Sequence, residues 1–406
     1  MNIMNRRKII IVAIIVFLLG TGGYLLLRRG DTGTKGGGIF SSIFPTSPDV
    51  PVNPPATGGA GGGGDSGGED GQTAGSPKRL FQLTQTAISG SVAVSTSTVR
   101  YIERQTGRVY EISPEGEGMK RITSTTILKT TDSFFSPKGD EVLIRYEQAE
   151  GEAKLQNFLA HIPSATSTPL ELTGAFIAKS AGFAAGRADD SLFYLEKSGN
   201  YTNGILTNFK NEKRKLIFSS PFGEFNTDFP NKDTVILLTK PSYSAPGFLY
   251  SINTKSQKLD KILGGIAGLT GLLSGDGKWV YYSESVNRLI KTKFFDILSK
   301  QSQDLGVNTL PEKCVWSRIK NDVIYCAVPS LIPGANYPDD WYQGLVSFDD
   351  NIWQISLGTG ETIVILSPDF YLGEGTDAVN LSLSPEESYL LYTNKKDGTL
   401  WSYKLK

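Results

Sequence analysis

The sequence predicts an all-β fold, a seven-bladed β-propeller over residues 78–406, and three observations support this prediction. From Lys78 onward the chain has no long helical periodicity, only short β-branched and aromatic runs separated by turn residues. A turn rich in Pro, Gly, Asp or Asn recurs before runs of four to six apolar or alternating residues. Most of these runs recur every 43 or 44 residues. A period near 40–45 residues with several strands per unit is typical of a propeller blade.

Seven of these runs are expected to form the second strand of a blade. Their successive starts are 43, 50, 43, 44, 44 and 66 residues apart. The first run is the weakest copy of the pattern, so a six-bladed ring is the alternative. The equivalent residues are Val99, Val142, Leu192, Val235, Trp279, Val323 and Tyr389.

The last unit reaches only its third strand, at residues 400–405, where the printed chain stops. Residues 78–84 match the pattern of a fourth strand, so we expect this N-terminal strand to complete the last blade. Ring closure of this kind leaves no open sheet edge between the first and last blades. The other fourth strands are expected at residues 120–123, 169–173, 214–217, 257–259, 303–305 and 361–364.

The repeated phrases resemble the WD40-like repeats of the TolB type, which also occur in the propeller domains of prolyl-oligopeptidase-like proteins. The closest copies are residues 135–144, 273–283 and 383–387, the last continuing to 400–403. This resemblance covers residues 78–406 and implies the fold, but propellers host unrelated activities. The chain has neither the α/β-hydrolase domain of the peptidases nor the N-terminal α/β domain of TolB. Neither peptidase activity nor a role in the Tol system is therefore implied.

The N-terminal part of the chain predicts a membrane anchor followed by a tether. Residues 9–27 carry no charge, and basic residues stand on both sides of them. Nineteen helical residues at about 1.5 Å each are long enough to span the bilayer core. We expect residues 1–8 in the cytoplasm, a single transmembrane helix at 9–27 and an extracytoplasmic propeller, with a cleaved signal peptide as the alternative. The Gly- and Pro-rich residues 28–77 are expected to form a disordered linker.

Composition argues against several classes of function. Forty-one Lys and Arg residues balance forty-one Asp and Glu residues, so no global field draws the chain onto nucleic acid. One His and two Cys residues exclude a His-rich or four-thiolate metal centre. His161 falls in an expected third strand, where a polar surface residue is commoner than a catalyst. The acidic pairs at 339–340 and 349–350 lack the alternating pattern of a calcium loop. We therefore expect no metal, no cofactor and no catalytic residue.

The two cysteines are expected to face each other across a hairpin. Cys314 and Cys326 each lie six residues from a turn centred near Lys320. Opposed Cβ atoms on adjacent strands are about 4.5–5.5 Å apart, close to disulfide spacing. We expect a structural disulfide, as suits an extracytoplasmic domain, and two buried free thiols are the alternative.

Residues 329–351 form a long loop between the second and third strands of the sixth blade. Long loops in compact domains are commonly functional, and this loop is rich in aromatic residues. Its aromatic rings suit stacking on a sugar or anchoring a protein, and its polar neighbours suit hydrogen bonding. The alternative is that the loop folds its aromatic side chains onto its own blade as extra core. The candidate binding residues are Tyr337, Asp339, Asp340, Trp341, Tyr342 and Gln343.

Together these features favour a protein- or glycan-binding or scaffolding module of the cell envelope, held to the membrane by its N-terminal helix. The alternative from another class is an envelope hydrolase or lyase with an acidic or metal-assisted site in the propeller channel. Converging carboxylates or titratable groups with shifted pKa values in the channel would favour the enzyme. A plain channel beside an exposed aromatic loop would favour binding.

Overall fold

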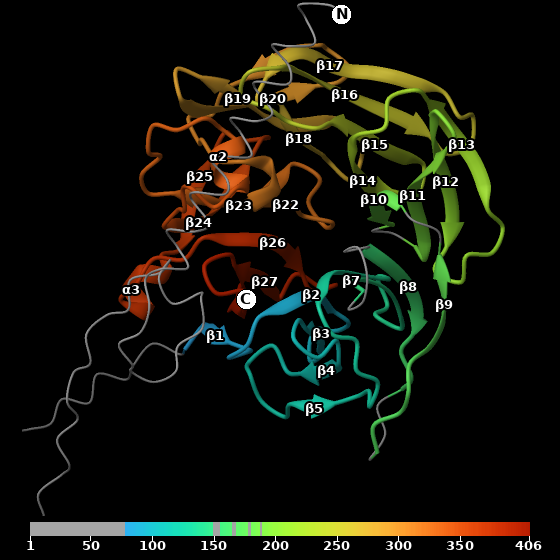
Figure 1. The fold of residues 1–406 in the computed structure, drawn as a ribbon. Helices are drawn as coiled ribbons and strands as arrows, with labels where there is room; N and C mark the ends of the chain where they lie inside the picture. Colours follow the sequence, from blue (N-terminus) through green and yellow to red (C-terminus); the bar gives the residue numbers. More distant parts are fainter. Residues whose placement is uncertain (1–77, 149–154, 165–167, 178–179, 187–188) are drawn as a thin grey trace, which may run out of the picture. The chain divides into compact units, whose positions relative to one another are not determined.

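The computed structural model describes residues 78–406 except 149–154, 165–167, 178–179 and 187–188. In this part of the chain, seven four-stranded antiparallel sheets surround a common centre (Figure 1). Each sheet is one blade of a propeller. The prediction of seven blades is confirmed, and the six-bladed alternative is wrong.

The strands of a blade follow one another from the centre of the ring to its edge, and they are numbered along the chain. Blade one consists of β2 (Ile88–Ala93), β3 (Val99–Glu103), β4 (Val109–Ile112) and β5 (Lys120–Arg121). Blade two consists of β6 (Thr130–Phe135), β7 (Glu141–Glu147), β8 (Leu155–His161) and β9 (Thr173–Ile177). Blade three consists of β10 (Ser180–Ala185), β11 (Ser191–Ser198), β12 (Tyr201–Asn208) and β13 (Lys215–Ser220).

The remaining four blades repeat this order, and three short helices lie in their connections. Blades four to seven consist of β14 (Phe225–Asn231), β15 (Thr234–Thr239), β16 (Pro246–Asn253) and β17 (Leu259–Ala267); β18 (Thr270–Leu273), β19 (Trp279–Val286), β20 (Leu289–Asp296) and β21 (Ser302–Gln303); β22 (Cys314–Trp316), β23 (Val323–Pro329), β24 (Asp350–Ser356) and β25 (Thr362–Leu366); and β26 (Ala378–Leu383), β27 (Tyr389–Asn394), β28 (Leu400–Lys404) and β1 (Leu80–Gln82). The helices are η1 (Pro311–Lys313), α2 (Asp339–Tyr342) and α3 (Pro368–Leu372).

The second strand of every blade begins at the expected residue or one residue before it. These strands lie inside their sheets with neighbouring blades against both faces, so consecutive side chains are buried. Val142, Leu143 and Ile144 of β7, for example, are all 0 % exposed. A strand buried on both faces appears in sequence as an uninterrupted apolar run, which explains why this element was recognisable.

The N-terminal strand closes the ring, as expected. Strand β1 pairs antiparallel with β28, and Leu80 lies opposite Tyr403. The guanidinium of Arg79 donates from Nε to the carbonyl of Lys404 at 3.0 Å and from Nη2 to that of Leu405 at 2.8 Å. One N-terminal and three C-terminal strands therefore share the seventh blade.

The fourth strand of blade two is misplaced in the sequence-based prediction. It runs over Thr173–Ile177 rather than residues 169–173. Leu170 instead forms an isolated parallel bridge with Thr123, and its amide donates to the carbonyl of Ile122 at 3.1 Å. An outer strand has only one strand neighbour, so its residues carry a weak pattern. The expected fourth strands at 257–259 and 303–305 likewise share only one residue with β17 and β21, and the remaining expected strands share at least two residues with the observed ones.

The disulfide between Cys314 and Cys326 is confirmed. The two residues are register partners on β22 and β23, with Cα atoms 4.1 Å apart. Both are buried, at 6 % and 0 % exposure. The bond therefore joins the innermost strand of blade six to its neighbour.

A carboxylate joins the inner hairpin of blade seven to that of blade six. Glu387 has a left-handed φ of 52°, at a turn position that Gly139 and Gly277 occupy in other blades. Its Oε1 accepts hydrogen bonds from the amides of residues 318 and 319, at 2.6 and 3.2 Å, and its Oε2 accepts from Ser317 Oγ at 2.8 Å. These hydrogen bonds between two blades account for the non-glycine residue at this position.

The predicted transmembrane helix at 9–27 and the predicted linker at 28–77 lie outside the described residues. Among the residues that are described, no helix is both long and apolar enough to cross a bilayer.

Candidate functional site

The innermost strands enclose a central channel with a cavity at each end. At one end, a cavity of about 490 Å³ lies among the turns between first and second strands. At the other end, a cavity of about 770 Å³ lies beside the turns between second and third strands. We call the larger cavity the channel mouth. The residues that line it include Ser89, Arg104, Thr131, Glu312, Asn380 and Lys395.

Irregular strands shape the channel mouth. The pairing of the first strand with the second shifts register near this end in β2, β6, β10 and β26. Such bulges redirect side chains and occur often beside functional sites. In β26 the irregular stretch includes Asn380, whose φ of 54° is left-handed. Ser89, Thr131 and Asn380 thus bring hydroxyl and amide groups to the channel mouth.

The long loop of blade six packs its largest aromatic side chains inward. Tyr337, Trp341 and Phe348 are 1 %, 4 % and 1 % exposed and form one apolar cluster with Ile290 and Leu310 of neighbouring elements. Tyr337 and Trp341 thus pack as additional core of their own blade, which was the alternative to ligand binding. Neither ring is open to stacking by a ligand.

The other predicted binding residues of this loop divide into two groups. Asp339 Oδ2 accepts from the amide of Tyr243 at 2.7 Å, and Asp340 Oδ2 accepts from that of Asn336 at 2.8 Å. These carboxylates hold the loop in place. Tyr342 and Gln343 are exposed. A binding role for the loop remains a prediction, and these two side chains are the ones open to a partner.

A buried ionic network lies beneath the loop, and no sequence pattern indicates it. The side chain of Lys313 is fully buried, and its ammonium group bonds Asp350 Oδ2 at 2.8 Å and the carbonyl of Ala378 at 3.0 Å. It also forms an ion pair with the buried Asp377. Lys313 and Asp377 are 64 residues apart in the chain, so only the adjacency of blades six and seven brings them together.

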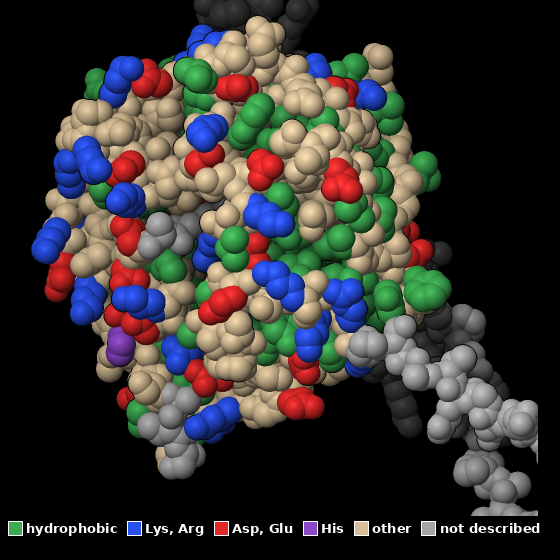
Figure 2. Space-filling model, turned by 180° about the vertical axis from the view of Figure 1, so that it is seen from behind, with side chains coloured by type: hydrophobic (Ala, Val, Ile, Leu, Met, Phe, Trp, Pro, Cys, Tyr) green, Lys and Arg blue, Asp and Glu red, His purple; other side chains and the backbone are tan. Residues whose placement is uncertain are grey.

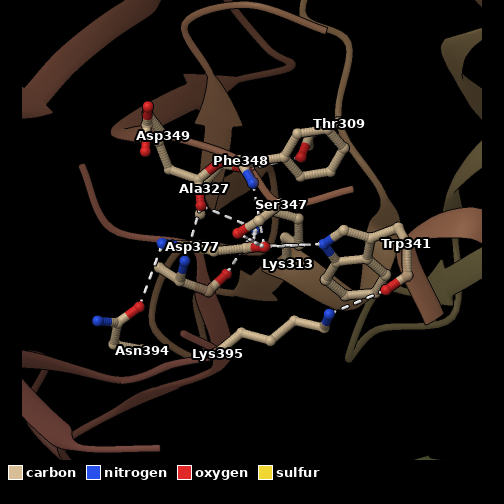
Figure 3. A network of polar contacts seen from close by, with 12 residues as sticks. Thr309, Lys313, Ala327, Trp341, Ser347, Phe348, Asp349, Asp377, Asn394 and Lys395 are labelled. Carbon is tan, nitrogen blue, oxygen red and sulfur yellow. Dashed lines mark hydrogen bonds and ion pairs between the residues drawn. The ribbon is translucent and has the colours of Figure 1, made fainter. Parts of the chain in front are cut away.

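Asp377 joins the loop to this network (Figure 3). Its carboxylate accepts from Trp341 Nε1 at 3.0 Å, Ser347 Oγ at 3.1 Å and the amide of Phe348 at 3.1 Å. The ammonium of Lys313 lies 5.3 Å from the ring centroids of both Trp341 and Phe348. The aromatic side chains therefore face a buried cation and its counter-ion.

The two aspartates have pKa values shifted in opposite directions. Burial raises the pKa of Asp350 to about 6, despite the nearby Lys313. Its Oδ1 finds no hydrogen-bond partner among the described residues. Burial also acts to raise the pKa of Asp377, but Lys313 and the loop donors outweigh it and lower that pKa. Asp377 is thus the better-stabilised anion.

Of the titratable groups that line the channel mouth, Glu312 and Lys395 have shifted pKa values. Glu312, in η1, has a solvent-exposed side chain, and partial desolvation by the protein around it raises its pKa. The hydroxyl of Tyr342 donates to it. Lys395, between β27 and β28, donates to the carbonyl of Trp341 at 2.9 Å and lies 4.8 Å from that ring centroid (Figure 3). Burial, with the charge of Lys313 adding to it, lowers the pKa of Lys395, although Asp377 opposes this.

No group of three or more His, Cys, Asp or Glu side chains in the described ranges is placed to hold a metal ion. His161 lies at the end of β8, with Nδ1 3.1 Å from Glu141 Oε1, and lines neither end of the channel. Figure 2 shows positive and negative side chains interspersed over the face that it draws, without a stripe of one sign.

Comparison with known proteins gives structural neighbours only. No protein-family model and no curated protein matches the chain. An oligogalacturonate lyase from Vibrio parahaemolyticus matches with a TM-score of 0.51 and 9 % identity, over 81 % of this chain and 90 % of the lyase. An oligogalacturonate lyase in complex with manganese matches with a TM-score of 0.50 and 10 % identity, over 81 % and 90 %. At this identity the likeness is one of fold, a β-propeller.

Proposed function

We propose that this chain acts on an acidic oligosaccharide at the channel mouth and cleaves it by β-elimination. The observation that carries the proposal is the pair Glu312 and Lys395, which line one cavity with pKa values shifted toward neutrality from opposite sides. A carboxyl group with a raised pKa is suited to donate a proton near neutral pH. An amine with a lowered pKa is suited to accept one.

The proposed reaction balances without water, an oxidant or a cofactor. Neutral Lys395 takes the proton from the ring carbon next to the uronate carboxylate. The electron pair forms a carbon–carbon double bond as the bond to the departing sugar oxygen breaks, and protonated Glu312 gives that oxygen a proton. Exchange with solvent then restores both groups. Manganese accompanies one of the lyases above, but the described residues do not fit such an ion, and no step uses one.

The form of the cavity supports a sugar ligand. Its volume of about 770 Å³ lies within the range of ligand sites, about 300–1,000 Å³. Ser89, Thr131 and Asn380 supply neutral hydrogen-bonding groups to it. Both named neighbours are lyases of oligogalacturonate, which is an acidic oligosaccharide. These neighbours favour the enzyme over a scaffold, by analogy of fold alone.

The test is an assay of the full-length chain against a panel of oligouronates. Product is measured by the ultraviolet absorbance of the new double bond. We expect Glu312→Gln and Lys395→Met each to lower kcat/KM by about 100-fold or more. Lys255→Met is the control, because Lys255 is exposed, pairs with Asp233 and does not line the channel mouth. Absence of product from every oligouronate would refute the proposal, as would full activity of both variants.

A second candidate function is binding without catalysis, as a glycan- or protein-binding module of the envelope. Tyr342 and Gln343, at the end of α2, are exposed and therefore open to a partner. Tyr342 also contacts Glu312 of the channel mouth, so a ligand in the mouth could reach both the loop and the channel. Calorimetric titration with the same oligouronates separates the two functions. Heat of binding without product supports this candidate, and loss of that binding in Tyr342→Ala would assign it to the loop.

We also propose that the propeller is extracytoplasmic and tethered by residues 9–27. The disulfide supports this location, because such bonds persist mainly in oxidising compartments. Both natural cysteines are bonded, so a Ser66→Cys variant adds a single free thiol. We expect a membrane-impermeant maleimide to label it on intact cells. Labelling only after lysis would place the propeller on the other side of the membrane.

A further inference from the structure

We propose that a groove between blades one and two continues the channel mouth and binds the sugars that follow the cleaved bond. This inference rests on the function proposed above and adds the path of the substrate. A third, shallow cavity, of about 530 Å³, opens beside the channel mouth. Arg104 and Thr131 line both spaces, so the two are contiguous. We call this shallow cavity the outer groove.

Arg104 is a cation available to a ligand. It lies in the turn between β3 and β4, where its amide donates to the carbonyl of Ala87 at 2.9 Å. The adjacent carboxylate, Glu103, is occupied by the hydroxyls of Thr106 at 2.6 Å and Thr86 at 3.1 Å. Among the described residues, no hydrogen bond or ion pair engages the guanidinium of Arg104. A planar guanidinium binds a carboxylate in two-point fashion, and a uronate offers one on every sugar.

The other walls of the outer groove also suit an acidic sugar. Leu128 is 60 % exposed and offers an apolar surface to the C–H face of a sugar ring. Lys129 and Gln105 add a second cation and an amide, and Glu147 is a hydrogen-bond acceptor for hydroxyls. Two cations against one carboxylate give this groove a positive balance. The groove therefore selects for a substrate that is longer than the channel mouth alone can hold and that is charged along its length.

The inference predicts an affinity that depends on chain length and on Arg104. The experiment measures calorimetric dissociation constants for oligogalacturonates of increasing length on full-length Glu312→Gln protein, in which cleavage of the bound oligomer is slowed. We expect longer oligomers to bind more tightly than short ones. Arg104→Gln should weaken only the longer oligomers, by about tenfold.

Arg108→Gln is the matched control. Arg108 lies in the same turn and carries the same charge, but its Nε donates to Thr126 Oγ1 at 3.3 Å and it lines neither cavity. Equal affinities of the Arg104 and Arg108 variants at every length would overturn the outer groove while leaving the proposed function intact. Length-dependent binding that Arg104→Gln abolishes, with no cleavage by the wild-type chain, would support the groove and overturn the elimination. No binding of any oligomer would overturn both.

Discussion

Replacing Asp350 with asparagine removes one carboxylate from the buried network around Lys313, and the sign of the stability change follows from its pKa. The folded protein holds the proton on Asp350 more tightly than the unfolded chain does, because burial raises the pKa from 3.8 to about 6. The stabilisation from this proton is complete below pH 3.8 and is lost as the pH rises through about 6. Asparagine does not titrate, so the unfolding free energy of the variant does not fall over this pH range for this reason.

The magnitude follows from the size of the shift. Each pKa unit corresponds to about 1.4 kcal/mol, so the contribution of Asp350 is about 3 kcal/mol. We therefore expect the unfolding free energy of Asp350→Asn, relative to wild type, to rise by about 3 kcal/mol between about pH 4 and pH 7. Asparagine keeps an acceptor for the amide of Ala378, which now donates to Asp350 Oδ2 at 2.7 Å.

Asp377→Asn is the matched comparison, because Asp377 binds the same lysine but has a lowered pKa. Its contribution is present above the unfolded pKa and is lost as the pH falls through the folded one. We expect this variant to lose about 3–5 kcal/mol at neutral pH and less in acid. The assay is urea unfolding of the full chain across the pH series, followed by tryptophan fluorescence. A difference between Asp350→Asn and wild type that stays flat or falls with pH would refute the reasoning.

Two further predictions concern the hydrogen bonds that link blade six to blade seven and the disulfide within blade six. Glu387→Gly relieves a left-handed backbone but removes the carboxylate that accepts hydrogen bonds from residues 317–319, so we expect a net loss of about 2–4 kcal/mol by urea unfolding. Glu386→Gly, at an exposed position of the same turn, is its control, and equal losses in both variants would argue against the carboxylate. The double variant Cys314→Ala/Cys326→Ala should lose about 3 kcal/mol, because the bond closes a loop with a sequence separation of 12. A reducing agent should destabilise the wild type by a similar amount and leave the double variant unchanged, whereas a wild type indifferent to reductant would contradict the estimate.

The blades were predictable because their second strands are covered on both faces and must be apolar without interruption. The disulfide was predictable because antiparallel pairing places residues at equal distance from a turn opposite each other, as with Cys314 and Cys326. The outer strands were less predictable. Leu170 shows why, because its pairing is with Thr123 of the neighbouring blade rather than within its own.

The candidate site could not be predicted in the same way. The loop of blade six was recognisable, but the orientation of Trp341 depends on a carboxylate, Asp377, 36 residues further along the chain. Glu312 and Lys395 carry no motif and lie 83 residues apart in the sequence. Each looks like an ordinary surface charge until the ring closes and surrounds both with protein.

Local periodicity therefore favoured seven blades, the strand that closes the ring and the cysteine pair, because each depends on residues a few positions apart or on a repeated spacing. The six-bladed ring and the free thiols stayed open as alternatives until the structure excluded them. Tertiary structure alone decided which aromatic side chains are buried and which titratable groups share the channel mouth. Burial and charge proximity are properties of the closed ring, and they shift the pKa values on which the proposed chemistry depends.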